Sequence, residues 1–268
     1  MDYSKIDDWH PLTLPSKGLY YRDANGNDLC PGGEVQISPW KTYQEEAMIK
    51  YGGINSSEFM SKLLQNNLQL PAGMTTDDLL MTDEFFILVQ LRCLSLTPYA
   101  TCPYTCPQCN NTEPVQVNFL DMDVVCPDET WPDEPVRVEL PVSGHTVDLR
   151  FMRVKDLAAI QSYEVKSNHE ASSSHYLARR VKAINGQPVK DFLQTRELLD
   201  KLVMLDSQIL ASALDEYETG YVMQTEIACK KCGFKYVAAI ARDASFFRPR
   251  RIDLERQAQD LRESRQRS

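Results

Sequence analysis

The sequence predicts an α+β fold: a small antiparallel β module with helical regions before it and inserted within it, and an extended arm at each end. The β module is indicated by two Cys-x-x-Cys pairs that lie far apart, each followed by alternating apolar residues. The helices are indicated by apolar residues that recur at helical spacing before the first pair and between the two pairs.

The two cysteine pairs are Cys106 with Cys109 and Cys229 with Cys232. Because the backbone turns tightly between such residues, both thiolates of a pair can face one metal ion, and two pairs supply the four sulfurs of a tetrahedral structural zinc site. The alternating residues that follow the pairs are Val115, Val117 and Phe119, and Phe234, Tyr236 and Ala238. A cysteine turn followed by a strand, used twice, is the construction of a zinc ribbon. We therefore expect these four cysteines to be the metal ligands.

The distance between the pairs is unusual, because 119 residues separate Cys109 from Cys229. Four-cysteine zinc sites ordinarily separate their pairs by roughly 12–20 residues. A shared zinc therefore requires a long insertion that leaves the β module and returns to it. The alternative is two unrelated thiol pairs, reduced in a cytosol or bridged as disulfides.

Length and composition fit a globular protein made and used in a cytosol. The chain has 268 residues, enough for about two domains, with 43% hydrophobic and 25% charged residues. No apolar run approaches the roughly 18–20 residues that span a bilayer, and the start lacks the basic and apolar regions of a signal peptide. Eight cysteines without an export signal favour metal binding over disulfides.

The charge distribution argues against DNA as the main partner. The net charge is −9, whereas phosphate recognition depends on clustered Lys and Arg. The exception is the C-terminal end, where residues 242–268 hold eight Arg or Lys against five Asp or Glu. A basic tail on an acidic body suits an acidic protein partner better than nucleic acid.

Residues 1–34 are rich in turn-forming residues, which indicates an extended arm. Leu14–Tyr21 offers an extended segment, a glycine turn and two tyrosines. Two roles stay open for this arm: its tyrosines anchor in the groove of a neighbouring protein, or it folds on its own body.

Residues 35–100 are predicted to be a helical region. After a short strand at 34–38, the expected helices are one from Thr42 through Met48, one marked by Phe59, Leu63, Leu64 and Leu68, and one over 83–96. The last is apolar on nearly every face, so it should be a central buried helix. Arg92 within it requires a carboxylate partner or an exposed edge, in a structural rather than catalytic role.

The remaining segments alternate between β and helical character. Residues 101–152 form the first part of the β module, with a hairpin around Ser143-Gly144, and 218–247 form the second, with a strand over 221–227. Residues 153–217 are the helical insertion, with expected helices over 156–165, about 170–184 and 195–217. The apolar stripe of the last helix is expected to pack in the core, and its members are Leu198, Leu199, Leu202, Leu205, Ile209 and Leu210.

The C-terminal segment, residues 248–268, is a basic tail in which 250–267 has helical spacing. Leu254, Ala258 and Leu261 form one stripe and charge covers the rest. Such a helix is marginal alone and stable when it docks on a partner.

Other chemistry finds little support. Cys102 with Cys106 and Cys109 has the spacing of a four-iron cluster in radical enzymes, but a hairpin and helices follow instead of a repeated strand–helix barrel. Dithiol redox pairs sit at helix starts, whereas these pairs lie between strands. His145 is kept only as a distant spare ligand, and Cys102 as a spare thiol beside the zinc. No catalytic residues are predicted, since phosphate loops and nucleophile elbows are absent from the sequence and a four-sulfur zinc has no open position.

An ordered set of motifs covers most of residues 10–250. The motifs are Leu14-Pro15-Ser16-Lys17-Gly18, Val35-Gln36-Ile37-Ser38-Pro39 leading to Glu45-Glu46, Asp83 to Leu88 with Leu91-Arg92, Tyr99 before the first cysteine pair, Cys229-x-x-Cys232-Gly233, and Phe246-Phe247-Arg248-Pro249. This ordered set resembles the baseplate hub or wedge-associated proteins of contractile-tailed, T-even-like bacteriophages. A glycine often follows the second cysteine of such a pair, as Gly233 follows Cys232. After Cys109 the residues are Asn110-Asn111 instead, and asparagine can adopt the same left-handed conformation.

The resemblance implies a non-enzymatic part of the virion tail baseplate that binds other baseplate or tail proteins, in the hub, wedge, tail-tube or tape-measure region. Two alternatives stay open: an assembly chaperone for the hub that is absent from the virion, and a zinc-ribbon regulatory protein that binds nucleic acid. The latter predicts a basic face on the ribbon, which Lys230, Lys231 and Lys235 do not form beside Glu113 and Glu226. A small molecule and a membrane are not expected as partners.

Overall fold

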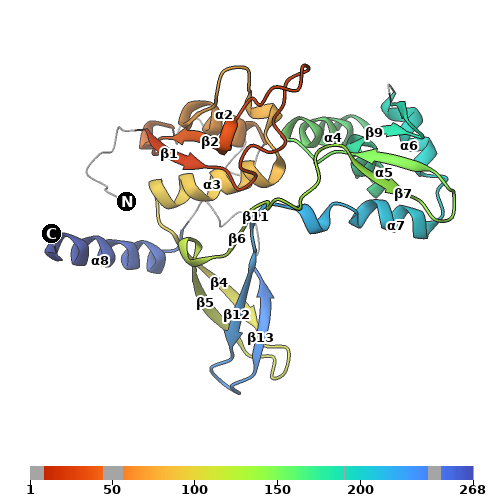
Figure 1. Ribbon diagram of the computed structural model, residues 1–268. Helices are drawn as coiled ribbons and strands as arrows, with labels where there is room; N and C mark the ends of the chain where they lie inside the picture. Colours follow the sequence, from red (N-terminus) through yellow and green to blue (C-terminus); the bar gives the residue numbers. More distant parts are fainter. Residues whose placement is uncertain (1–8, 45–56, 190, 241–248, 268) are drawn as a thin grey trace.

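The computed structural model describes residues 9–44, 57–189, 191–240 and 249–267. Figure 1 shows an N-terminal body, a lateral unit beside it, and two hairpins that project from the body. The C-terminal helix lies at the base of the hairpins, on the side away from the lateral unit. Within the described ranges, no helix combines the length and the apolar character needed to cross a membrane.

The N-terminal body combines a three-stranded antiparallel sheet with two helices. Strand β1 (His10–Thr13) pairs with β2 (Glu34–Ile37), and β2 pairs with β3 (Leu68–Gln69). Helix α2 (Ser57–Asn67) precedes β3, and α3 (Met81–Ser95) follows it. Apolar residues from the sheet and from both helices share one core. The helix expected from Thr42 begins as a short 3-10 turn, Thr42–Gln44, and its remainder lies outside the described residues.

Helix α3 is the central element, as its uniform apolar character predicts. Ten of its 15 residues are buried, so the helix has no fully solvated face. Arg92 is not at an exposed edge: it is only 1% exposed. Its guanidinium donates to the carbonyl oxygens of Thr97 and Tyr99 and lies 5.1 Å from the centre of the Phe119 ring. The chain thus turns at the end of α3 around a buried, structural arginine.

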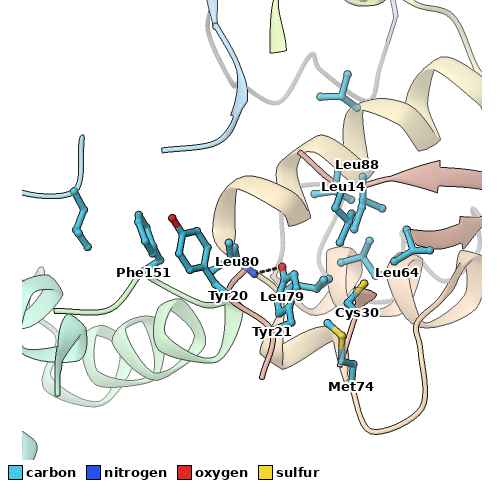
Figure 2. Close-up of a cluster of buried hydrophobic side chains, with 14 of the residues drawn as sticks. Leu14, Tyr20, Tyr21, Cys30, Leu64, Met74, Leu79, Leu80, Leu88 and Phe151 are labelled. Carbon is cyan, nitrogen blue, oxygen red and sulfur yellow. Dashed lines mark hydrogen bonds between the residues drawn. The ribbon is translucent and has the colours of Figure 1, made fainter. Parts of the chain in front are cut away.

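The segment before β2 belongs to this core, which decides between the two roles left open for the arm. Leu14, Tyr20, Tyr21 and Cys30 are all at most 3% exposed (Figure 2). The tyrosines therefore anchor the segment on its own body and are not available to a neighbour. Residues 1–8 lie outside the described part of the chain.

A buried carboxylate fixes this segment on α3. Asp83 accepts hydrogen bonds from the Ser16 amide (3.2 Å), the Ser16 hydroxyl (2.5 Å) and the Tyr21 hydroxyl (2.7 Å). The Tyr21 hydroxyl also accepts from the Leu80 amide at 2.9 Å, the dashed line in Figure 2. Desolvation raises the pKa of Asp83, although the Ser16 and Tyr21 hydrogen bonds oppose that shift.

Two glycines allow close backbone contact within this N-terminal segment, between residues 17–18 and residues 30–33. Gly18 and Gly33 both have positive φ angles, +79° and +73°. A Cβ on Gly18 would lie 1.8 Å from the Cys30 carbonyl oxygen, and one on Gly33 would lie 2.8 Å from the Lys17 Cα. The backbones therefore approach more closely than any side chain at these positions permits.

The lateral unit is a four-stranded antiparallel sheet with helices around it. The sheet order is β10-β9-β8-β7. Its strands are β7 (Val136–Glu139), β8 (Thr146–Leu149), β9 (Val181–Ile184) and β10 (Gln187–Pro188). Its helices are α4 (Val154–Ser167), α5 (Ser173–Arg180), α6 (Phe192–Leu199) and α7 (Met204–Ser212). The β7–β8 hairpin confirms the prediction from its alternating residues.

Two helix predictions in this unit are wrong in part. The helix expected through residue 184 ends at Arg180, because the β-branched and apolar residues of β9 pair with β8 instead. Asn185-Gly186 consequently turns between two strands rather than between two helices. The helix expected over 195–217 is two helices, α6 and α7, followed by a 3-10 turn at Asp215–Tyr217.

The lateral unit leaves and rejoins the rest of the chain at one place. Strand β6 (Val124–Val125) pairs antiparallel with β11 (Gly220–Tyr221). The Tyr221 hydroxyl accepts a 2.6 Å hydrogen bond from Gln90 on α3, and its ring lies 5.1 Å from that of Phe86. The outgoing and returning segments are thus held together beside the central helix.

Candidate metal centre

Two β-hairpins that are distant in sequence lie side by side below the body (Figure 1). The first consists of β4 (Tyr99–Thr105) and β5 (Thr112–Asn118), and the second of β12 (Gln224–Ala228) and β13 (Lys235–Ala239). Each cysteine pair occupies the turn that joins the strands of one hairpin. The hairpins thus bring both turns to the same end of the projecting pair.

The two turns have the same backbone geometry. The amide of Cys106 donates to the Asn111 carbonyl (2.9 Å), and the Asn110 amide donates back to Cys106 (3.0 Å). The second turn repeats both bonds, from Cys229 to Phe234 and from Gly233 to Cys229, at 2.9 and 2.8 Å. Asn110 and Gly233 both take left-handed φ angles, +54° and +73°. Asparagine therefore replaces glycine in the first turn, as expected.

The four sulfurs form a compact cluster. The Sγ atoms of Cys106, Cys109, Cys229 and Cys232 all lie within 4.8 Å of one another. Two contacts between the hairpins, Cys106 to Cys232 and Cys109 to Cys229, measure 3.7 Å. Zinc–sulfur bonds of about 2.3 Å in a tetrahedron place the sulfurs about 3.8 Å apart, whereas a disulfide requires about 2.05 Å. The donor set and the spacing both fit zinc, and no position would stay open for catalysis.

The pKa values of two thiols in the cluster shift in opposite directions. Amide donation from Cys232 and Lys231 lowers the pKa of the Cys229 thiol to about 7. The Phe234 amide acts in the same direction on Cys232, but desolvation and the neighbouring sulfurs raise the pKa of that thiol to about 12. One thiolate forms readily, and further thiolates repel it. A divalent metal ion would balance this charge.

Protein contacts also join the two hairpins. The buried carboxylate of Glu113 on β5 accepts a 2.9 Å hydrogen bond from the Lys230 amide in the second turn. The hydroxyls of Tyr104 and Tyr236 are buried near the cluster, and desolvation raises the pKa of both phenols. Sequence reasoning weighed Glu113 only as a surface charge, because no local pattern shows that a carboxylate will meet a turn more than one hundred residues away.

The C-terminal helix α8 (Arg251–Arg267) buttresses the first hairpin through polar contacts. Asp253 is 1% exposed and accepts hydrogen bonds from the Thr101 amide (3.3 Å), the Thr101 hydroxyl (2.6 Å) and Gln116 (3.0 Å). By contrast, Leu254 of the expected apolar stripe is 45% exposed. The helix therefore docks on its own chain through buried Asp253 and Gln257, while Ala258 and Leu261 of the expected stripe are half-buried.

The other cysteines and His145 stand apart from the cluster. Cys102 lies on β4 opposite Val115, and His145 contacts Asn185 (2.9 Å) in the lateral unit. Neither belongs to the four-sulfur group. Burial raises the pKa of Cys30 to about 11 and that of Cys93 to about 12, so these thiols are inert packing groups. The hairpin setting of Cys106 and Cys109 does not match that of a radical-enzyme iron–sulfur loop.

Comparison with known proteins identifies a family. The family model described as "T4 bacteriophage base plate protein" matches residues 23–248. This range contains both cysteine pairs, the lateral unit between them and α3. No curated protein and no solved structure shows a significant match to the chain. Because the family match covers most of the chain, the protein belongs to the T4 bacteriophage base plate protein family.

Proposed function

We propose that the protein is a non-enzymatic structural component of the contractile-tail baseplate, associated with its hub or wedges. One zinc ion, bound by Cys106, Cys109, Cys229 and Cys232, fastens the two hairpins. The supporting observation is the compact cluster of four sulfurs, assembled from two turns of matching geometry in a chain of the baseplate family. A closed four-sulfur site has a structural role, because all four coordination positions are filled by protein.

The proposed partners are neighbouring baseplate and tail proteins in the virion. Of the described residues near the two chain ends, those of α8 are more accessible to a partner than those of the N-terminal segment. Ile252 and Leu254 on this helix are 55% and 45% exposed, while the residues around Tyr21 are buried in the body. Helix α8 would contact a neighbouring protein through these exposed residues, while Asp253 holds the helix on the first hairpin.

Metal content tests the zinc site. Elemental mass spectrometry on the purified chain is expected to find one zinc per chain, and both Cys106→Ser and Cys229→Ser should lose it. Zinc that survives either substitution would show that the hairpins do not share the ion. Iron in place of zinc would contradict the assignment of the metal.

Particle composition tests the location. Quantitative mass spectrometry on purified phage should find the chain in the tail, at a fixed ratio to the other baseplate proteins. Its presence in infected cells but absence from finished particles would contradict a virion component and favour an assembly chaperone. This result is independent of the metal content, so the two parts of the proposal can fail separately.

A further inference from the structure

Apolar side chains near the break between α6 and α7 are exposed, although the sequence predicts that this stripe packs in the core. α6 ends at Leu199, and Val203 before α7 has an extended backbone with ψ of 151°. Leu199 and Leu210 reach the core at 5% and 0% exposure, whereas Leu198 and Leu205 are 50% and 57% exposed. The expectation that the whole stripe packs internally is therefore wrong for Leu198 and Leu205.

Of these side chains, Leu198 and Leu199 border a groove in the lateral unit. The groove has a volume of about 360 Å³ and lies between the β7–β8 hairpin, the β9–β10 turn and the α6–α7 break. Val142, Leu198 and Val203 line it and are 56%, 50% and 48% exposed. Met204, which follows directly, is 73% exposed. Exposed apolar side chains gathered around a groove are typical of protein contact sites.

Polar contacts behind the groove hold its walls in place. Asp206 on α7 is fully buried and accepts hydrogen bonds from the amides of Val142 (3.1 Å) and Ser143 (2.8 Å). On the opposite wall, Asn185 accepts from the Thr146 amide at 2.9 Å. The hairpin tip is thus fixed both to α7 and to the β9–β10 turn. A groove formed in advance binds with a smaller entropy loss than one that must be ordered first.

The charges around the groove indicate what it receives. Of the described residues that line it, Lys201 and His145 carry the ionisable side chains. The nearby Asp200 is paired with Arg196 at 3.3 Å. The groove therefore offers an exposed cation and an apolar floor, within a protein whose net charge is −9. The complementary occupant is an apolar segment that carries a carboxylate.

We propose that this groove binds an acidic segment of a neighbouring baseplate protein, whose aliphatic side chains enter between Val142, Leu198 and Val203 while a carboxylate pairs with Lys201. The inference rests on the proposed function, because it takes the partner from the baseplate. The volume lies at the small end of the roughly 300–1,000 Å³ range of binding pockets, which suits a few side chains rather than a whole helix. The contact is separate from the metal site and from α8.

Site-directed photo-cross-linking in assembled particles tests this contact. The cross-linking residue p-benzoylphenylalanine replaces Leu198 in one variant and Val165 in a control variant, since Val165 is an 83% exposed aliphatic residue on α4. Both sites are exposed, so both variants should unfold at the wild-type temperature. We expect the Leu198 position to cross-link to a peptide of another baseplate protein in which aliphatic residues adjoin Asp or Glu. The Val165 position should not capture that peptide.

Charge reversal tests the pairing with Lys201. Adding Lys201→Glu should lower the cross-linking yield at position 198 about two- to fivefold, the range of an exposed ion pair. Lys166→Glu on α4 is the matched control and should leave the yield unchanged. An equal loss in both variants, or no loss with Lys201→Glu, would overturn the ion pair and with it the proposed acidic occupant.

The remaining outcomes separate this inference from the proposed function. If the chain is present in particles and position 198 cross-links to nothing, to its own chain or to a second copy, the groove proposal is wrong and the baseplate role stands. If the chain is absent from particles, both are wrong.

Discussion

The N-terminal body and the cysteine hairpins hold distant segments of the chain together by different interactions. Both bring together segments that are distant in sequence, Ser16 with Asp83 in the body and Cys106 with Cys232 in the hairpins. The body surrounds a helix with ten buried residues, so apolar burial holds it and a few buried hydrogen bonds fix its register. Each hairpin has only two strands and cannot form a sufficient core alone. A metal ion would supply what apolar burial cannot.

Metal removal should separate the two regions most clearly. Structural zinc contributes about 10–16 kcal/mol in small zinc-binding peptides, so a strong chelator is expected to unfold the hairpins and leave the body folded. Hydrogen exchange should show lost protection in 99–118 and 224–239 but not in α3. Cys126→Ser, at an exposed cysteine outside the cluster, is the control and should retain the metal. Hairpin amides that remain protected from hydrogen exchange after metal loss would show that the hairpins do not depend on a metal ion.

Overpacking the body should be the next largest effect. Gly18→Ala places a Cβ 1.8 Å from the Cys30 carbonyl oxygen, so we expect a loss of about 3 kcal/mol in the free energy of unfolding. Gly26→Ala is the matched control, because Gly26 also has a positive φ angle but no heavy atom within 4 Å of the added Cβ. It should lose only about 1 kcal/mol, the cost of the left-handed conformation. Equal losses in urea unfolding would show that the close approach is not rigid.

The two regions should respond to pH in opposite directions. Desolvation raises the pKa of Glu84 at the start of α3 to about 7. A carboxyl whose pKa is raised on folding favours the folded state below its unfolded pKa, and this contribution is lost as pH rises through about 7. The cysteine cluster should instead weaken toward acid, because protons compete with the metal for thiolates.

Glu84→Gln tests the first half of this comparison. The variant should gain roughly 1–3 kcal/mol over the wild type at pH 8, and the gain should fade toward pH 4. Comparing the two proteins at each pH cancels the acid sensitivity of the metal site. Glu197→Gln, at an exposed glutamate, is the control and should show no such trend. A gain independent of pH would refute ionisation of Glu84 as its cause.

The smallest predicted effect concerns the attachment of α8 to the hairpin. Asp253→Ala removes the acceptor for Thr101 and Gln116, so we expect about 2 kcal/mol less protection of the helix against hydrogen exchange. Glu255→Ala removes only an exposed contact with Arg251 and should cost about 0.3–0.5 kcal/mol. If both variants exchange alike, α8 is not held through Asp253.

Features set by local chemistry followed from the sequence. The spacing within each cysteine pair defines a turn, and asparagine can replace glycine in the left-handed position, so the turn of Asn110 was predictable. The assignment of the four clustered cysteines as metal ligands stays a prediction. The uniform apolar character of residues 83–96 likewise identified α3. In each case the determining residues lie within a few positions of one another.

Features set by distant contacts did not follow. Every residue from Thr195 to Leu205 is compatible with a helix, so the sequence did not indicate the break between α6 and α7. In the structure, Asp206 on α7 accepts a hydrogen bond from the amide of Val142, which lies on a hairpin more than sixty residues earlier. The contacts of Asp253 on α8 were not predicted, because the apolar pattern of the helix leaves a charged residue in solvent. The burial of a carboxylate cannot be predicted from sequence unless its hydrogen-bond donors are known. The division of the chain into six segments stays a prediction.

The pairing of β6 with β11 has a consequence for how members of such a family can diverge. Val125 and Gly220 are partners across an antiparallel pair, so about ninety residues begin and end at adjacent points. The length of chain between those points does not alter the distance between the cysteine turns. Insertions, deletions or a wholly different unit can occupy that position while the four-cysteine cluster stays intact. The sequence separation between the two cysteine pairs is therefore free to vary, and searches for metal sites that assume a short spacing will overlook clusters of this kind.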